Sequence, residues 1–63
     1  MRYNISKFRK RAKMTQTELA EKANVSRATI SGLESGRVKS VSMATLEKIA
    51  DALNKPVTKI FLP

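Results

Sequence analysis

The segment TQTELAEKANVSRATISGLESG, residues 15–36, constrains the fold more than any other part of this chain. Thr15 is a typical N-cap residue, and Glu18 completes a capping-box pattern at the start of a helix. Ser26 is a second N-cap residue, directly ahead of the helical pattern RATISGLES. A very short connection separates the two patterns, and Asn24 at its centre tolerates the left-handed backbone of a sharp corner. The segment therefore predicts two short helices that meet at a steep angle.

Size and charge narrow the class of protein. With 63 residues the chain has room for one domain, over residues 1–63, with a small core. Thirteen lysines and arginines against five acids leave a net charge of +8, and there is no cysteine or histidine. So basic a domain favours an acidic partner, most often nucleic acid and less often an anionic membrane; a merely solvated surface is the alternative. The lack of cysteine suits a reducing compartment, and we expect a cytoplasmic protein.

Hydrophobic spacing predicts further helices on either side of the corner. Asn4 or Ser6 would cap the first helix, and Ser42 the fourth. Gly36 would end the third helix in a left-handed conformation, and Pro56 would open the last. We expect five helices and no sheet, with the helices approximately over residues 5–13, 16–23, 27–35, 43–53 and 57–61. A strand near the C-terminal end is the alternative, and we disfavour it because it would have nothing to pair with.

The same spacing assigns the core. The positions expected to face inward are Ile5, Phe8, Ala12, Leu19, Ala20, Ala23, Val25, Ile30, Leu33, Met43, Leu46, Ile49, Ala50 and Leu53. The opposite faces of the first helix are basic, and the positive residues up to position 13 are Arg2, Lys7, Arg9, Lys10, Arg11 and Lys13. One interpretation of these charges is a solvated face. The other is a strip beside a phosphate backbone, where each neutralised phosphate steepens the log–log salt dependence of binding by about 0.9.

From Arg9 to Phe61 the chain resembles the helix-turn-helix domain of lambdoid phage repressors and Cro proteins. The matching residues are Arg9, Thr15-Gln16, Glu18-Leu19-Ala20, Val25-Ser26, Thr29-Ile30-Ser31, Glu34, Gly36, Thr45-Leu46, Ile49-Ala50 and Ala52-Leu53. The resemblance implies an all-α, five-helix domain of the lambda-repressor type. It also implies a transcriptional regulator, most simply a phage or bacterial repressor, that binds specific sequences of double-stranded DNA without a cofactor or metal.

In that family the helix here predicted over residues 27–35 lies in the major groove, and its first residues contact base edges. The resemblance implies that the base-reading residues are Arg27, Ala28, Thr29, Ser31 and Gly32, on the exposed side of that helix. Arg27 can pair with guanine through two hydrogen bonds, and a phosphate contact is the alternative. Ala28 would contact a thymine methyl group or read nothing.

The resemblance also implies contacts to the DNA backbone. The residues concerned are Gln16, Ser26, Ser35, Arg37, Lys39, Ser40 and Ser42. Gln16 has independent support, because free N–H groups at the start of a helix favour an anion; the alternative is that Gln16 only helps to cap the helix. For the loop after the third helix, the alternative is a flexible, solvated segment.

Two charged residues receive a structural role from the resemblance. Arg9 and Glu34 would form an internal ion pair that ties the first helix to the end of the third. The chain also departs from the family pattern, with Asn24 where glycine is usual and Val41 where proline is usual. Gly32 is a further departure, because several relatives carry a base-reading side chain there. We expect Gly32 to allow a close approach, either to a sugar-phosphate edge or in packing against the first or fourth helix.

Other classes of function remain as alternatives. An enzyme is not expected, because the chain has no histidine or cysteine and no acid pair spaced for proton transfer. A basic amphipathic membrane binder would need one long helix with a bulky apolar face. An antitoxin-like module that binds a toxin as well as its own operator remains open.

The C-terminal residues raise the question of assembly. Val41, Val57, Phe61 and Leu62 are candidates for a small two-fold interface, whereas Ile60 is expected to complete the core. We expect a weak homodimer that tightens on DNA and reads half-sites about one helical turn apart. The chain would be either a small Cro-like protein complete in itself or a DNA-binding fragment of a longer repressor.

Overall fold

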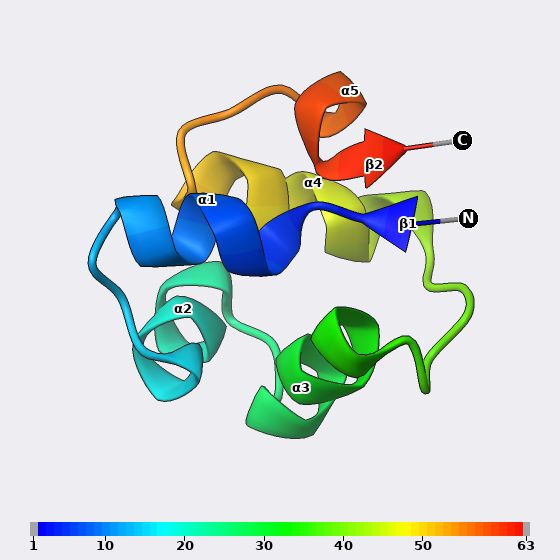
Figure 1. The fold of residues 1–63 in the computed structure, drawn as a ribbon, viewed down its shortest axis with the longest axis horizontal. Helices are drawn as coiled ribbons and strands as arrows, with labels where there is room; N and C mark the ends of the chain where they lie inside the picture. Colours follow the sequence, from blue (N-terminus) through cyan, green and yellow to red (C-terminus); the bar gives the residue numbers. More distant parts are fainter. Residues whose placement is uncertain (1, 63) are drawn as a thin grey trace.

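The computed structural model describes the backbone of residues 2–62 and the side chains of residues 3–60, and this part forms five helices around one core (Figure 1). The helices are α1 (Ile5–Arg11), α2 (Gln16–Ala23), α3 (Arg27–Ser35), α4 (Met43–Ala52) and α5 (Val57–Ile60). Two short strands, β1 (Arg2–Tyr3) and β2 (Phe61–Leu62), join the chain ends. The all-α fold class is confirmed, with α2 and α3 forming the helix-turn-helix.

The helix starts follow the local sequence. Thr15 and Glu18 form the predicted capping box: the Glu18 N–H donates to Thr15 Oγ1 at 3.0 Å, and the Thr15 N–H donates to Glu18 Oε1 at 2.8 Å. Ser26 and Ser42 accept in the same way from backbone N–H groups, each at 3.1 Å. Asn4 occupies the cap position of α1 without a side-chain cap bond. The starts of α2, α3 and α4 are therefore fixed by residues three positions apart.

Left-handed residues end the helices. Asn24, Asn54 and Gly36 have φ values of 57°, 56° and 81°, as the sharp ends of α2, α4 and α3 require. Lys13 is also left-handed, with φ 60°, and this corrects the predicted end of the first helix from residue 13 to Arg11. Because α1 stops early, Ala12 is exposed and does not belong to the core.

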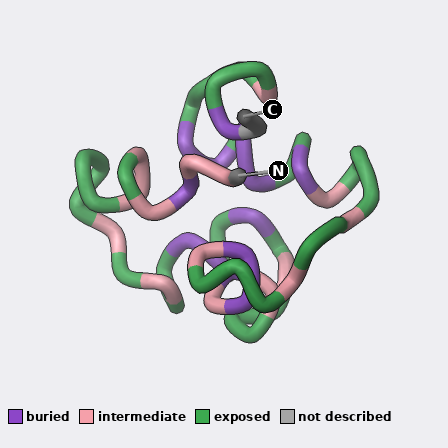
Figure 2. Tube along the Cα trace, turned by 45° about the vertical axis from the view of Figure 1, so that its right-hand side comes forward, coloured by how far each residue is buried: buried purple, intermediate pink, exposed green. Residues whose placement is uncertain are grey.

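Most of the other predicted core positions are buried, and the fully buried side chains are Ile5, Leu19, Ile30, Ile49 and Ile60. Phe8 and Val25 are only partly buried and pack against this core. Figure 2 shows the buried positions on the inward sides of the helices. Met43 is a correction, because it opens α4 and is 57% exposed. Val41 and Val57 are partly buried against the core, which reduces what they offer to a second copy. The side chains of Phe61 and Leu62, the other interface candidates, lie outside the described residues.

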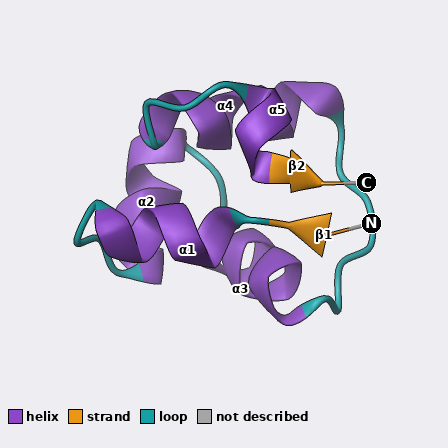
Figure 3. Ribbon diagram, turned by 45° about the horizontal axis from the view of Figure 1, so that its top comes forward, coloured by secondary structure: helices purple, strands orange, loops and turns teal. Residues whose placement is uncertain are grey.

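The prediction of no sheet was wrong. β1 and β2 pair antiparallel, with Arg2 opposite Leu62 and Tyr3 opposite Phe61 (Figure 3). The Asn4 N–H continues this connection by donating to the Ile60 carbonyl at 2.6 Å. The strand at the C-terminal end does have a partner, because the fold brings it beside the N-terminal residues of β1. The predicted last helix is accordingly shorter, and ends at Ile60.

Candidate nucleic-acid interface

The first turn of α3 is an exposed surface at one side of the molecule, opposite α5 (Figure 1). Arg27 and Ala28 are exposed, whereas Thr29 and Ser31 are half-buried. Thr29 Oγ1 lies 2.8 Å from Ser26 Oγ, so the cap of α3 and its first turn hold each other in place. Arg27 is therefore presented to solvent from a helix start that is rigidly capped, with a side chain long enough to reach a base edge.

Gly32 differs from the other predicted base-reading residues. It is buried, and not on the exposed side of α3 as expected. Val38 lies over it: the Val38 N–H donates to the Gly32 carbonyl at 3.0 Å, and a Cβ on Gly32 would come within 3.2 Å of the Val38 Cβ. The close approach that explains the glycine is made by the loop after α3, rather than by α1, α4 or an external ligand.

The predicted ion pair between Arg9 and Glu34 links α1 to the helix-turn-helix. Arg9 Nε donates to Glu34 Oε2 at 2.7 Å, and Arg9 Nη2 donates to Glu34 Oε1 at 3.0 Å. The remaining guanidinium nitrogen, Nη1, donates to the Met14 carbonyl at 2.8 Å. The two side chains are only 12% and 9% exposed. This fork geometry joins α1, the end of α3 and the turn before α2 through one side chain.

The charges of this pair are stabilised in place. Burial raises the pKa of the Glu34 carboxyl, but hydrogen bonds from Arg9 and Gln16 and the charges of Arg9 and Lys10 outweigh it, so the pKa lies below its usual value. The hydrogen bond to Glu34 likewise raises the pKa of Arg9. Glu34 is therefore an ionised carboxylate whose negative charge is stabilised by positive charges and hydrogen bonds within the protein.

Gln16 lies at the start of α2 and belongs to this network. Its Nε2 donates to Glu34 Oε1 at 3.1 Å, and the side chain is half-buried. An amide NH₂ has two donors, and this bond uses one of them. Gln16 is thus oriented by Glu34 at the start of α2, and its second N–H takes no part in this bond.

The α3–α4 loop carries the other predicted backbone contacts. Arg37, Lys39, Ser40 and Ser42 are all exposed. The Ser35 hydroxyl donates to the Gly32 carbonyl and accepts from the Arg37 N–H, each at 3.3 Å, so it ties the end of α3 to the loop. The hydroxyls of Ser26 and Ser42 serve as helix caps. The loop thus presents two exposed cations, Arg37 and Lys39, after the end of α3.

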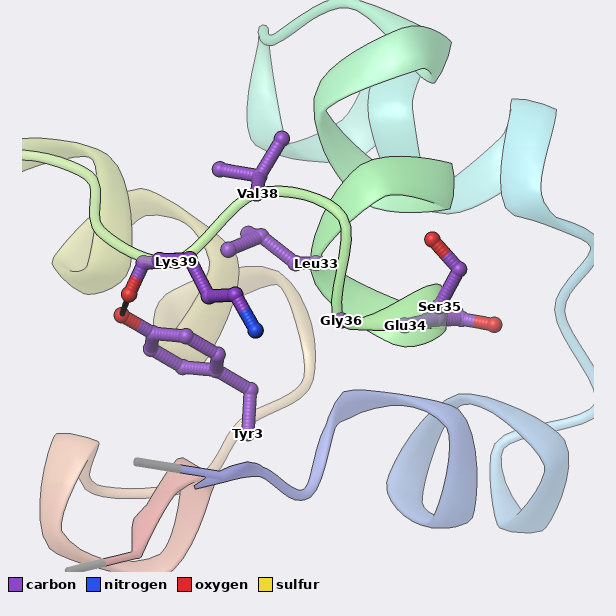
Figure 4. A pocket seen from close by; sticks show the side chains of 7 residues that line it. All are labelled: Tyr3, Leu33, Glu34, Ser35, Gly36, Val38 and Lys39. Carbon is purple, nitrogen blue, oxygen red and sulfur yellow. Dashed lines mark hydrogen bonds between the residues drawn. The ribbon is translucent and has the colours of Figure 1, made fainter.

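Tyr3 holds this loop from the N-terminal side. Its hydroxyl donates to the Lys39 carbonyl at 3.2 Å (Figure 4). A small pocket of about 230 Å³ lies beneath, lined by residues of the α3 end and the loop together with Tyr3. Nothing in the sequence linked Tyr3 to the loop, since the two are 36 positions apart and meet only through the fold.

The cations of α1 do not act as one strip. Arg9 is used in the internal pair, and Lys7 and Arg11 lie around Phe8, beside the segment that joins α4 to α5. That segment lies away from α3 in Figures 1 and 3. Lys7 and Arg11 are therefore not beside the surface that contains Arg27. The side chain of Arg2 lies outside the described residues.

Residues 2–62 contain no group of three or more acidic, histidine or cysteine side chains placed to hold a metal ion. None of the helices within the same residues combines the length and the apolar character needed to span a membrane.

Comparisons with known proteins agree with this geometry. The helix-turn-helix family profile matches residues 5–60. The immunity repressor protein of Bacillus phage phi105 is 45% identical over 56 residues, which are 89% of this chain but only 38% of that repressor. An uncharacterized HTH-type transcriptional regulator of Archaeoglobus fulgidus is 40% identical over 62 residues, or 98% of this chain and 86% of that protein. The uncharacterized HTH-type transcriptional regulator YozG of Bacillus subtilis is 38% identical over 50 residues, which are 79% of this chain and 60% of that protein. The chain belongs to the helix-turn-helix family.

Proposed function

We propose that this chain binds double-stranded DNA through α3 and regulates transcription, most simply as a repressor. The observation that carries the proposal is the exposed, capped start of α3 with Arg27 at its first position. A helix has the right diameter to enter the major groove, and arginine is the commonest side chain in specific contact with guanine. The name of the phage relative, an immunity repressor, supports repression as the outcome.

The contacts divide into reading and positioning. Arg27, Ala28, Thr29 and Ser31 read base edges, with Arg27 contributing most because it is the longest and the most exposed donor. Gly32 is left out, since Val38 covers it. The residues that contact the DNA backbone are Gln16, Ser26, Ser35, Arg37, Lys39, Ser40 and Ser42. Backbone contacts fix the register on the duplex, and base contacts choose the sequence.

Two copies bind one operator in this proposal. The half-sites lie about one helical turn apart, and the dimer is weak without DNA. Met43 supports a contact between copies, because it is a large, 57% exposed hydrophobic side chain next to the α3–α4 loop. The surface is small, which is why the dimer is expected to need DNA. We place the protein in the cytoplasm, where its DNA would be.

Selection from random duplex DNA tests this function. The full chain is mixed with random duplexes at a stated, fixed salt concentration, and the retained sequences are read after several rounds. We expect a short motif, repeated with two-fold symmetry, and repression of a reporter that carries it. Retention without any enriched motif would contradict sequence-specific binding. An enriched motif without two-fold repetition would contradict only the proposed dimer and would leave sequence-specific binding supported.

A further inference from the structure

A second basic surface lies between α1 and the segment that joins α4 to α5. It forms a groove of about 710 Å³, and we name it the Phe8 groove after the aromatic ring in its wall. Its charged residues are Lys7, Arg11, Lys55 and Lys59. The segment between α4 and α5, which supplies part of the lining, lies on the side of the molecule away from α3 (Figures 1 and 3). One side of α1 and two residues of α5, Thr58 and Lys59, therefore belong to a cationic surface that the proposed DNA contacts do not use.

The cations of the Phe8 groove are gathered around one ring. The nitrogens of Lys7 and Lys55 lie 5.9 and 5.4 Å from the centroid of Phe8, and the guanidinium carbon of Arg11 lies 5.8 Å from it. Within residues 3–60, the ion pair between Arg9 and Glu34 is the only one. The lining of the groove thus contains four cations and no carboxylate, and the mutual repulsion of these cations favours an anionic occupant.

The groove also offers groups other than charge. Phe8 is half-buried and packs against the core, so its accessible part provides a fixed apolar contact. Asn4, Asn54 and Thr58 line the same groove with side chains that can hydrogen-bond a peptide backbone. An apolar ring, polar side chains and four cations in one lining are together suited to an extended segment in which acidic and apolar residues alternate.

We propose that the Phe8 groove binds an acidic segment of a partner protein, in which aspartate or glutamate lies next to leucine or phenylalanine. Two other occupants fit less well. Duplex DNA has the charge, but its exposed apolar groups, the thymine methyls, lie inside the major groove behind the phosphates, whereas Phe8 is half-buried. A second copy would have to bring its own net charge of +8 towards four cations. Because the segment between α4 and α5 lies away from α3, the chain can hold this partner while α3 is on DNA.

The test uses a synthetic peptide in which aspartate and glutamate alternate with leucine and phenylalanine. Two control peptides replace the acids by asparagine and glutamine, or the apolar residues by serine. Fluorescence anisotropy with the full chain at low salt measures the affinity. We expect the first peptide to bind and each control peptide to bind at least about tenfold more weakly. Equal binding by the serine control would overturn the proposal, because charge alone would then account for the affinity.

Matched variants locate the site. The double variant Lys7→Gln/Lys55→Gln should lower peptide affinity by about tenfold or more. The double variant Lys22→Gln/Lys48→Gln removes the same charge from exposed positions on α2 and α4, and should change it by no more than about twofold. Equal losses in the two variants would overturn the proposal. Melting curves of both variants verify that they are folded.

Chemical-shift mapping of the wild-type chain gives a result that does not depend on any substitution. Adding the peptide should move the backbone amide signals of Lys7, Phe8, Arg11 and Lys55 most. Largest shifts at Arg27 or Arg37 would overturn the proposal, because the peptide would then occupy the surface proposed for DNA. Tighter binding in the groove by a single-stranded oligonucleotide of equal charge would overturn it in favour of nucleic acid.

Discussion

Val38 packs over Gly32, and the two residues also share a hydrogen bond from the Val38 N–H to the Gly32 carbonyl at 3.0 Å. This contact folds the α3–α4 loop back onto the helix that precedes it. The loop carries Arg37 and Lys39, so the position of these cations depends on the absence of a side chain at residue 32. A glycine in a helix interior normally costs about 0.5–1 kcal/mol relative to alanine. At residue 32 glycine is nevertheless required, because a side chain there would clash with Val38 of the α3–α4 loop.

Gly32→Ala is therefore expected to destabilise the chain, although alanine is the better helix former. The added methyl group meets the stiff, β-branched Val38, and overpacking of this kind costs about 1–3 kcal/mol in the free energy of unfolding. Urea denaturation followed by circular dichroism measures the change. Combining it with Val38→Ala should recover part of the loss. An unchanged or raised stability of Gly32→Ala alone would contradict this account of the contact.

Tyr3→Phe should loosen the α3–α4 loop without unfolding the chain. The change removes the hydroxyl that donates to the Lys39 carbonyl, a neutral hydrogen bond at an exposed site that contributes about 1 kcal/mol or less. We expect a small loss of stability and a loss of DNA affinity of up to about fivefold, because the loop cations are less well placed. Anisotropy on a selected duplex checks the affinity. Unaltered DNA binding together with a lowered stability would show that Tyr3 does not position the loop.

Glu34→Gln should cost about 3 kcal/mol of unfolding free energy at neutral pH, because it leaves Arg9 nearly buried and without a countercharge. The pKa of Glu34 is lowered in the folded protein, so its ionised form stabilises the fold above the ordinary glutamate pKa. That stabilisation is lost as the pH falls through the lowered value. Urea denaturation at several pH values should show the wild-type chain losing more stability below about pH 4.3 than Glu34→Gln loses. If the free energy of unfolding depended on pH in the same way in both proteins, the proposed contribution of ionised Glu34 would be contradicted.

The salt dependence of DNA binding should identify the cations at the phosphate backbone. Arg37→Gln and Lys39→Gln are each expected to reduce the slope of log affinity against log salt by about 0.9. Lys22→Gln and Lys48→Gln serve as controls of the same charge change, with little expected effect on the slope. An equal reduction in all four variants would mean that net charge, rather than the α3–α4 loop, determines the affinity.

Local features of the fold could be predicted from the sequence. The caps at Thr15, Ser26 and Ser42 depend only on residues three positions away, and the left-handed Asn24 and Gly36 have the right residue types for a helix end. Those elements agree with the structure because no distant segment is needed to form them.

Most other features were missed or wrong; among contacts between distant segments, the Arg9–Glu34 pair was predicted, but only through the resemblance. Lys13 is left-handed, although lysine does not favour this conformation; the Arg9 side chain holds the turn through the Met14 carbonyl. The β1–β2 pairing and the Tyr3 contact exist only once both chain ends are placed. The role of Gly32 could not be decided either, because Val38 follows it by six positions across a loop of unknown path.

The central claim, that α3 reads bases through Arg27, is tested most directly by repeating the selection with Arg27→Ala and with Arg37→Ala. Both variants remove one positive charge from an exposed position. We predict that Arg27→Ala loses the preference at one base pair in each half-site, equivalent to about 1–3 kcal/mol of discrimination, and that Arg37→Ala keeps the motif while binding all sequences more weakly. An Arg27→Ala variant that retains the complete motif and only binds every sequence more weakly would contradict the claim.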